Sequence, residues 1–415
     1  MPKYNGMVLA DIHVGAFNLE KLHEEYLEMV IHHIKEMKSL DFLIVAGDFF
    51  DHKFYLNDKG STVAYAMLQE LLLACKEKET AVRFVYGTES HECDQYNILS
   101  LLKIYTNVEI IKFAKEEELL PGLQVLYLPE EYLMDSEKYY NKFFQNTKKY
   151  DYVFGHGVIR EVMKEAVVHM ENKETKNSKR KKVPIFSSAV LSRICKGQIF
   201  FGHYHINQNI DDKIFSIGSF SRWKFGEEGV KGYYELTCNT EKEKYKATHI
   251  ENTMADTYTT IAYGYESNIF ESSEDMNNVM NNMDKMIQNK IFDHVRFMIN
   301  IPSDAENPES TINFLKGRYK FNEKVKVDFS HGYVEERKKQ EKEKLKETNE
   351  KYAFINDESL SLEDKASHFI EITYNTSIPS NVINIYMNSP LKDILEMDQF
   401  NDENESDGLN NEECN

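Results

Sequence analysis

The chain has 415 residues, which at about 100 to 200 residues per domain predicts two or three domains. Hydrophobic residues make up 41% and charged residues 29%, a globular composition that excludes a largely disordered or fibrous protein. No run of about 18 uncharged apolar residues occurs, and the first residues lack the apolar stretch of a secretory signal. We therefore expect a cytoplasmic protein that does not cross a membrane.

Charge is unevenly distributed along the chain. The formal net charge at pH 7 is -19, yet residues 398–415 hold seven acidic residues and no basic one. We expect these residues to form an acidic disordered tail, so the overall acidity does not exclude nucleic acid as a partner. The five cysteines include no Cys-x-x-Cys pair, which disfavours a disulfide framework and a thiolate zinc site.

Short apolar runs alternate with helical patterns in the first part of the chain. Apolar residues from Leu19 to Met37 recur at spacings of three and four, which predicts a helix between strands at 7–10 and 42–46. The same alternation predicts helices near 62–76 and 135–146 and further strands at 81–86, 123–128, 152–155, 198–201, 214–217, 232–236 and 244–250. This order predicts an α/β domain over residues 1–255, a sandwich with two packed sheets.

The rest of the chain divides into four segments. Residues 256–330 follow a β-α-β-α-β pattern and predict a small α+β cap domain. Residues 331–352 are rich in Glu and Lys and predict a charged helical connector. Apolar residues return in 353–397, which predicts C-terminal helices, the first opened by Ser361 and Asp364 spaced as a capping box. The fourth segment is the tail at 398–415.

Acidic and imidazole side chains follow several predicted strands. Because strand C-terminal ends gather at one edge of a sheet, these residues can converge. A single residue of this kind after a strand is most often a cap or a surface residue. However, five of the fourteen histidines fall in such places, which indicates a shared site. The residues are Asp11, His13, Asp48, His91, His156, His203 and His205.

This mixture of ligands favours particular metals. Carboxylates and imidazoles together suit Mn, Fe or Zn better than Ca or Mg. Two such ions about 3.5 to 4 Å apart can clamp a phosphate and lower the pKa of a bridging water. Gly47, Gly87, Gly155 and Gly202 precede candidate ligands, where a tight turn or a close backbone approach requires a missing side chain.

These motifs resemble the calcineurin-like metallophosphoesterase superfamily. The resemblance is carried by Asp11-x-His13, Gly47-Asp48-x-x-Asp51, the segment Gly87 to Glu92, Gly155-His156 and Gly202-His203-x-His205. Within it, the chain resembles SbcD-type DNA repair exonuclease subunits, including the related T-even phage recombination nuclease subunits. That likeness is carried by Gly218-Ser219, Arg222, Phe225, Glu227 and Lys231-Gly232. It covers most of the chain.

The resemblance implies two Mn ions and an acid. One ion would be held by Asp11, His13, Asp48 and His205, and the other by Asp48, His156 and His203. His91 would protonate the leaving sugar oxygen. Asp51 falls where some members carry a catalytic histidine.

One segment departs from the family pattern. The family's Gly-Asn-His-Asp segment is two residues longer here and lacks the asparagine that binds the second ion. Ser90 occupies the place before His91 and is the expected replacement, with Glu89 as the alternative. The second metal site is thus the one that the sequence defines less completely.

Two basic segments are candidates for DNA contact. Residues 173–182 hold six basic residues against one acid, including Lys179, Arg180 and Lys181. Such a run is usually a solvated loop, and phosphate contact is the alternative. Arg222 adjoins Trp223, Lys224 and Phe225, an interleaving of aromatic and basic residues that suits contact with DNA strands or, alternatively, core packing.

The resemblance implies a Mn-dependent DNA nuclease subunit, with exonuclease and endonuclease activity, that hydrolyses phosphodiester bonds with a metal-activated water. It also implies a homodimer, DNA binding by the cap at 256–330, and an SbcC-type coiled-coil ATPase bound by residues 353–397. Two alternatives remain open. One is a metallophosphoesterase that acts on small phosphodiesters or phosphoproteins, and the other is a scaffold subunit with weakened catalysis.

Overall fold

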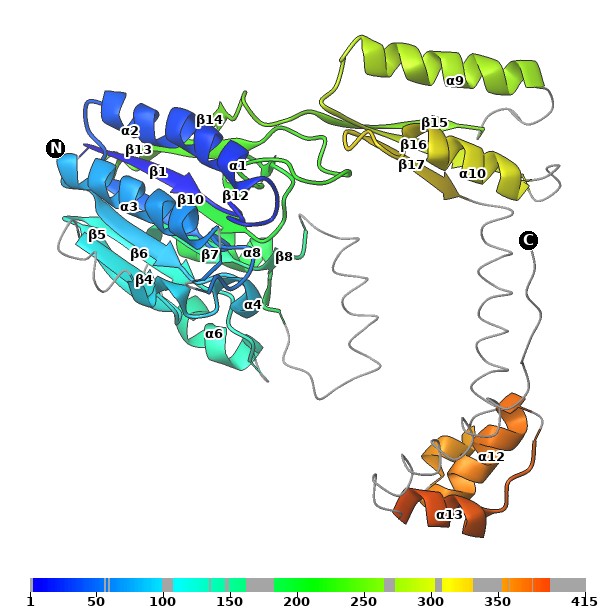
Figure 1. Ribbon diagram of the computed structural model, residues 1–415. Helices are drawn as coiled ribbons and strands as arrows, with labels where there is room; N and C mark the ends of the chain where they lie inside the picture. The colour runs from blue at the N-terminus through cyan, green and yellow to red at the C-terminus, as the bar shows by residue number, and fades with distance from the viewer. Residues whose placement is uncertain are drawn as a thin grey trace, which may run out of the picture. The chain divides into compact units, whose positions relative to one another are not determined.

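The structure is a computed structural model of the chain (Figure 1). It describes residues 3–55, 57–58, 60–98, 107–133, 136–145, 149–161, 183–264, 273–302, 308–330, 353–357, 359–374 and 376–388. The chain divides into two compact units, each of which is described by itself. One unit comprises Met1–Ile299 and Asn313–Asp328, and the other comprises Asn300–Ile312 and Phe329–Asn415.

The first large sheet has the strand order β14-β13-β1-β2-β3-β4. Strands β1 (Lys3–Leu9), β2 (Phe42–Ala46), β3 (Ala81–Val85) and β4 (Asn107–Ile111) are parallel. Strand β13 (Gly232–Asn239) pairs antiparallel with β1, and β14 (Lys244–Glu251) pairs antiparallel with β13. Every residue of β2 and β3 is buried, because both faces of this part of the sheet are covered.

The second large sheet has the strand order β11-β12-β10-β7-β6-β5. Strands β6 (Leu123–Leu128), β7 (Tyr150–His156), β10 (Cys195–Gly202) and β12 (Ile214–Ser216) are parallel. Strands β5 (Lys115–Leu120) and β11 (Gln208–Ile210) run antiparallel at its two edges. Short strands β8 (Val158–Ile159) and β9 (Ile185–Phe186) pair with each other.

The two sheets pack face to face, as the sequence predicted. Along β2, Phe42 and Ile44 point into the core between the sheets, while Leu43 and Val45 point to the helices on the other side. This alternation has the period of two that a strand imposes. The observed fold is therefore an α/β sandwich with mixed sheets, which confirms the predicted class at this level.

Helices cover the outer face of each sheet (Figure 1). The first sheet packs against α1 (Leu19–Tyr26), the π-helical turn η1 (Leu27–His32), α2 (His33–Glu36) and α3 (Ser61–Glu77). The second packs against α6 (Ser136–Phe144) and α8 (Ser188–Ile194). None of the helices in the described residues is long and apolar enough to span a bilayer.

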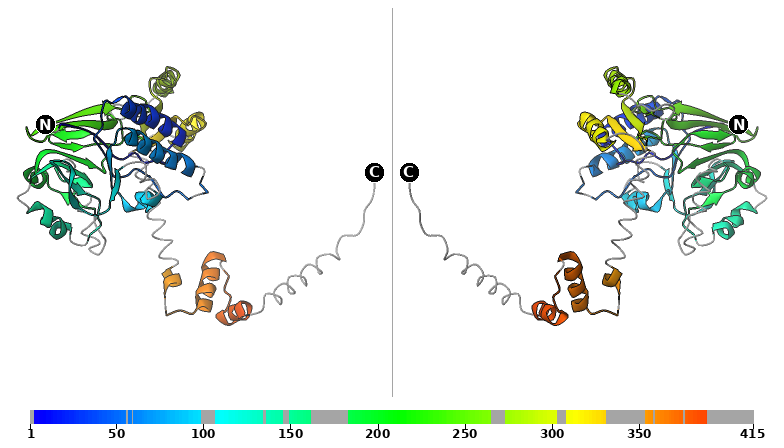
Figure 2. Two further views of the ribbon diagram at one scale, coloured as in Figure 1. Left: turned by 90° about the vertical axis from the view of Figure 1, so that its left-hand side faces the viewer. Right: turned by 90° about the vertical axis from the view of Figure 1, so that its right-hand side faces the viewer.

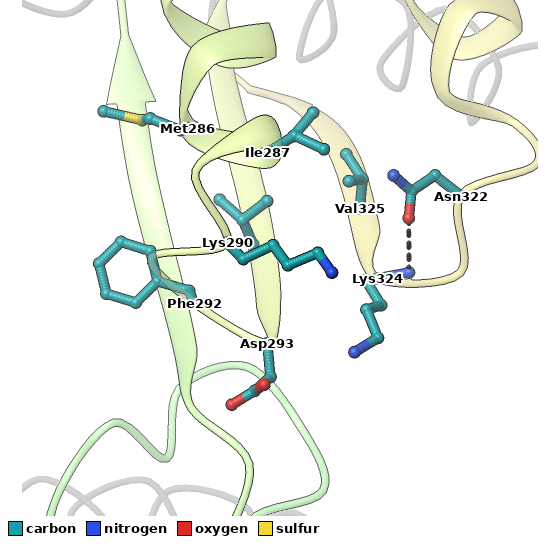
Figure 3. Close-up of a pocket in the computed structure, with 9 residues that line it drawn as sticks. Met286, Ile287, Lys290, Phe292, Asp293, Asn322, Lys324 and Val325 are labelled. Atoms are coloured by element: carbon teal, nitrogen blue, oxygen red, sulfur yellow. Dashed lines mark hydrogen bonds between the residues drawn. The ribbon is translucent and has the colours of Figure 1, made fainter.

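The predicted β-α-β-α-β module is present as a separate three-stranded sheet. Its strands are β15 (Tyr258–Tyr263), β16 (His294–Asn300) and β17 (Val325–Ser330), and its helices are α9 (Ser273–Gln288) and α10 (Pro308–Tyr319). A pocket of about 300 Å³ lies between the end of α9 and the start of β17 (Figure 3). Apolar Met286, Ile287 and Val325 line it together with Lys290 and Lys324.

The second unit contains a short 3-10 turn, η4 (Ala353–Asn356), and the helices α12 (Leu362–Tyr374) and α13 (Ser380–Asn388), orange and red-orange in Figure 2. The predicted capping box is present, since Ser361 Oγ accepts from the Asp364 N–H at 3.1 Å and donates to Asp364 Oδ2 at 2.7 Å. The predicted connector at 331–352, the end of the predicted helices at 389–397 and the tail at 398–415 lie outside the described residues.

Candidate metal centre

Six of the predicted ligands meet where parallel strands of the two sheets end. They form overlapping groups, and within each group the possible ligand atoms lie within 4.8 Å of one another. Five of these ligands follow the strands β1, β2 and β10, and His156 is the last residue of β7. The six ligands are Asp11, His13, Asp48, His156, His203 and His205. The structure thus brings residues from four strands and both sheets into one site.

The backbone at four of these residues is left-handed. The φ angle is 48° at Asp11, 50° at His13, 50° at Asp48 and 98° at His203. Residues with a side chain rarely adopt this conformation, and such strain gathers at functional sites. The surrounding fold therefore stabilises an unfavourable backbone conformation at these four residues, and this conformation sets the direction of their side chains.

Two of the predicted glycines are required by close contacts at this site. A Cβ atom on Gly87 would lie 2.3 Å from Asp48 Oδ1, and one on Gly47 would lie 2.0 Å from His156 Nδ1. Gly47 also has a φ of 85°. A side chain at either position would displace a candidate ligand.

The first ligand group contains Asp11, His13 and His205. The Nε2 atoms of the two histidines lie 3.1 Å apart and 3.9 and 3.8 Å from Asp11 Oδ1. A carboxylate contacts the other nitrogen of each ring. His13 Nδ1 lies 3.1 Å from Asp51 Oδ1, and His205 Nδ1 lies 2.7 Å from Glu227 Oε1. Such a partner directs the other ring nitrogen toward a cation. Asp51, predicted as catalytic, therefore lies where it positions His13.

The second ligand group contains His156, His203 and a residue that the sequence analysis did not identify, Glu130, and Asp48 adjoins this group through His156. Asp48 Oδ2 lies 3.3 Å from His156 Nε2 and 3.7 Å from His13 Nε2, so one carboxylate oxygen faces both groups. Glu130 Oε2 lies 3.0 Å from His203 Nδ1. Asp48 has the position that a bridging ligand requires.

Ser90, the expected replacement for the missing asparagine, lies on the short helix α4 (Glu89–Glu92) and is exposed, as is Glu89. Thr88 faces the second group instead. Its N–H donates to Asp48 Oδ1 at 2.7 Å, and its hydroxyl lies 3.1 Å from Asp48 Oδ2 and 3.4 Å from Glu130 Oε2. The structure thus does not bring Ser90 to the other ligands.

His91 lies beside the shared carboxylate. Its Nδ1 is 3.0 Å from Asp48 Oδ2, and its ring meets that of His13 edge-on with 4.9 Å between the centroids. The side chain is 30% exposed, whereas that of Asp48 is 3% exposed. His91 therefore borders the solvent, and this position would allow it to exchange a proton with a bound group.

Opposite charges perturb the buried groups of the site. Burial alone would raise the pKa of Asp48, but His156, His91 and His13 hold this pKa well below its usual range. Burial alone would lower the pKa of His156, yet Asp48, Asp11 and Glu130 raise it well above its usual value. A cation that binds His156 Nε2 must therefore displace a proton from it.

The donor set fits metal ions. It combines carboxylate oxygens and imidazole nitrogens, and the four cysteines of the described residues are free and join none of the groups. Among the described residues, the fully buried His156 Nε2 has no hydrogen-bond partner, although two carboxylate oxygens lie within 3.4 Å of it. Buried groups of this kind can hold metal ions.

Glu92 is a buried acid next to the site. Its Oε1 accepts from the Phe49 N–H at 3.3 Å and from the Tyr96 hydroxyl at 3.0 Å, on the short 3-10 helix η2 (Gln95–Ile98). Burial, together with the charge of Asp48, raises the pKa of Glu92 to about 8. Because this pKa lies above the ordinary value of 4.5, the contribution of Glu92 to stability is complete below pH 4.5 and is lost as the pH rises through about 8.

We expect Glu92→Gln to reduce the loss of stability at alkaline pH. In chelator-treated protein, the wild-type free energy of unfolding should fall between about pH 5 and pH 9 by roughly 2 to 4 kcal/mol more than that of the variant. Urea unfolding at the two pH values measures this. Glu89→Gln, a change at an exposed neighbour on the same helix, is the matched control. Parallel pH dependence in wild type and Glu92→Gln would contradict the assignment.

The residues predicted to contact DNA have different surroundings. Trp223 is half-buried, and its ring centroid lies 4.9 Å from those of both His13 and His205, so it adjoins the metal site. Arg222 donates to the Gly229 carbonyl at 3.1 and 2.9 Å and so holds its own loop; its contact with DNA stays a prediction. Lys179, Arg180 and Lys181 lie outside the described residues.

Comparison with known proteins does not place the chain in a family. No protein-family description and no curated protein matches the sequence. A functional assignment therefore depends on the strand-end residues and on their geometry.

Proposed function

We propose that the chain is a Mn-dependent phosphodiesterase of the calcineurin-like metallophosphoesterase type that cuts DNA as the nuclease subunit of an SbcCD-type complex. The observation that carries this proposal is the meeting of six strand-end ligands around Asp48, whose Oδ2 faces both His13 and His156. Two carboxylate and imidazole pockets with one shared carboxylate suit two adjacent cations that clamp a phosphate. Mn²⁺ accepts this mixture of donors.

Cations are needed at this site before a phosphodiester can bind. The carboxylates of Asp11, Asp48 and Glu130 are buried there and would repel a phosphate. Bound ions supply the neutralising charge and the acidification of water that hydrolysis requires. The chain's own residues hold the pockets in shape, since Asp51 and Glu227 fix the two histidines of the first group. His91, at the border with solvent, would give a proton to the leaving oxygen.

The surroundings of the site favour DNA over small phosphodiesters. Trp223 offers a half-buried ring beside His13 and His205, and the 58% exposed Lys224 places its Nζ 5.8 Å from the centre of this ring. An aromatic ring next to a basic side chain suits base stacking with contact to a backbone phosphate. Lys290 and Lys324 line the cap pocket together with the acidic Asp293 and add two further basic side chains that could contact phosphate (Figure 3).

One digestion experiment tests the proposed function. Purified protein is incubated with end-labelled duplex DNA and, separately, with bis(p-nitrophenyl) phosphate, with and without Mn²⁺. We expect Mn-dependent cleavage of both, with DNA preferred. Cleavage of only the small ester would favour the general phosphodiesterase, and no Mn-dependent cleavage of either substrate would overturn the proposal.

We also propose that the second unit binds the ATPase of the complex and that the nuclease is a homodimer, as the family resemblance implies. In the second unit, Leu362 is 63% exposed and Phe369 is 41% exposed, and both lie on α12. Exposed apolar side chains on one helix suit docking on a partner.

We expect the double change Leu362→Asp and Phe369→Asp to weaken binding to the ATPase by at least about tenfold, because charged groups would have to be buried at the interface. Mn-dependent cleavage of short DNA should be unchanged. Phe321→Asp, which alters a 90% exposed apolar residue of the cap, is the matched control. Co-purification with the ATPase measures the effect, and unchanged co-purification of the double variant would exclude α12 as the docking helix.

A further inference from the structure

The second ligand group lacks the neutral amide that the family resemblance implies, and it contains a carboxylate instead. We propose that Glu130 is a direct ligand of the second cation and replaces the missing asparagine with a charged oxygen. This inference rests on the proposed function only in assuming that cations occupy the site. It changes the electrostatics of the second pocket, which then holds one negative charge more.

The fold brings Glu130 to the pocket by the same rule as the other ligands. Strand β6 pairs in parallel with β7, with Leu128 opposite Gly155. Glu130, two residues after Leu128, therefore leaves its strand beside the place where His156 ends β7. The Glu130 N–H donates to the Tyr86 carbonyl at 3.0 Å, which ties this turn to the segment that precedes Gly87.

The two oxygens of Glu130 have different environments. Oε1 accepts from the Tyr132 hydroxyl. Oε2 lies 3.0 Å from His203 Nδ1, 3.4 Å from His156 Nε2 and 3.4 Å from Thr88 Oγ1. The carboxylate is fully buried. Tyr132 thus orients the group, and Oε2 is the oxygen that faces His156 and His203, two of the predicted ligands of the second ion.

The unpartnered nitrogen of His156 is an independent sign of a ligand here. His156 Nδ1 donates to the Ala46 carbonyl at 2.8 Å, which fixes the ring and directs Nε2 toward Asp48 and Glu130. Nε2 is buried without a hydrogen bond in the described residues. Leaving such an atom unsatisfied costs about 1 to 3 kcal/mol. A cation held by Asp48, Glu130 and His203 would satisfy it.

A purely structural role for Glu130 explains less of this arrangement. A structural carboxylate buried for stability needs hydrogen bonds to its oxygens, and a Glu130–His203 pair would supply one. It would not explain why the oxygens of Asp48 and Glu130 both approach the same nitrogen of His156. Two carboxylates that converge on one imidazole nitrogen repel each other unless positive charge lies between them. A proton on His156 Nε2 supplies such charge but forms no hydrogen bond with either oxygen among the described residues, whereas a cation can be shared by both carboxylates.

The test measures metal binding directly and needs no cleavage assay. Mn²⁺ is titrated calorimetrically into chelator-stripped full-length protein, and the bound equivalents are counted. Glu130→Gln keeps the size of the side chain and removes its charge. We expect wild type to bind two equivalents and Glu130→Gln to bind the second at least about tenfold more weakly. Unchanged affinity for both equivalents in Glu130→Gln would overturn the inference and leave the proposed function standing.

Two control variants sharpen the result. Glu131→Gln alters the adjacent carboxylate, which accepts from the Ala114 N–H at 2.8 Å outside the ligand groups, and should bind two equivalents. Ser90→Ala should also bind two, because Ser90 is exposed. Loss of the second equivalent in Ser90→Ala, with Glu130→Gln unaffected, would assign the ligand to Ser90 and overturn the inference. Wild type that binds no Mn²⁺ would overturn the proposed function itself.

A second substitution keeps the test decisive if Glu130→Gln does not fold. Glu130→Asp retains the charge and withdraws the oxygen by one methylene, so its affinity for the second ion should fall about tenfold. Circular dichroism of each chelator-stripped variant shows whether it is folded. A folded Glu130→Asp protein with wild-type affinity for both ions would overturn the inference.

Discussion

Asp48→Ala is expected to abolish Mn-dependent cleavage of DNA and to remove both bound cations together. Asp48 Oδ2 lies within 3.7 Å of imidazole nitrogens from both ligand groups, so its removal takes a ligand from both pockets at once. Without the bridge, two cations at short separation repel each other and the phosphate loses both of its clamps. Calorimetric titration of Mn²⁺ and digestion of end-labelled duplex measure the two losses.

The matched control for this change is Asp94→Ala. Asp94 is 68% exposed and pairs with Lys112 away from the ligand groups, so its removal should leave metal content and cleavage unchanged. Retention of two Mn equivalents by Asp48→Ala would show that Asp48 is not the bridging ligand. Loss of both metals by Asp94→Ala would instead show that the assay reports general instability.

The parts of the fold that the sequence predicted correctly are those in which burial dominates. Strand β6 has the predicted bounds, 123–128, because its apolar run is buried between the inter-sheet core and the helices. The helix predicted near 62–76 is α3, at Ser61–Glu77. In long buried segments the spacing of apolar residues predicts the secondary structure, and the tertiary contacts favour the same structure.

The strand β5 could not be predicted in this way. Its sequence, Lys-Glu-Glu-Glu-Leu-Leu, is mostly charged and is typical of a solvent-exposed loop. In the structure it forms an edge strand of the second sheet. Charged residues are common on edge strands, where they prevent pairing with other chains. One of them has a partner in the other sheet, since Glu117 Oε1 lies 2.7 Å from Nη2 of the buried Arg83 on β3. That pairing exists only in the folded protein.

Glu130 is a candidate ligand that the sequence analysis could have identified but missed. Pro129 and Glu130 directly follow the predicted strand at 123–128, so the rule that identified the other strand-end ligands also applied here. Glu130 was missed because it lies in none of the motifs that carry the resemblance. The parallel pairing of β6 with β7 brings Glu130 beside His156, and this pairing exists only in the folded protein.

His91→Asn is expected to slow DNA cleavage by about 10²- to 10⁴-fold, the effect of removing a general acid. Asparagine can still hydrogen-bond to Asp48, but it cannot give up a proton near neutral pH. In the metal-free site, the hydrogen bond to Asp48 raises the pKa of His91. Wild-type cleavage should decline as the pH rises through the pKa of His91 in the Mn-loaded protein, and the decline should be absent from the variant.

Metal content separates the proton donor from a ligand at this position. His91→Asn should bind as many Mn equivalents as wild type and should bind DNA with unchanged affinity. His32→Asn is the control, because His32 is 57% exposed on the helical segment at 19–36 and pairs only with Glu28 among the described residues. If His91→Asn binds fewer Mn ions than wild type, His91 is a metal ligand and not the proton donor. The geometry would allow this, because the possible ligand atoms of His91, His13 and Asp51 lie within 4.8 Å of one another.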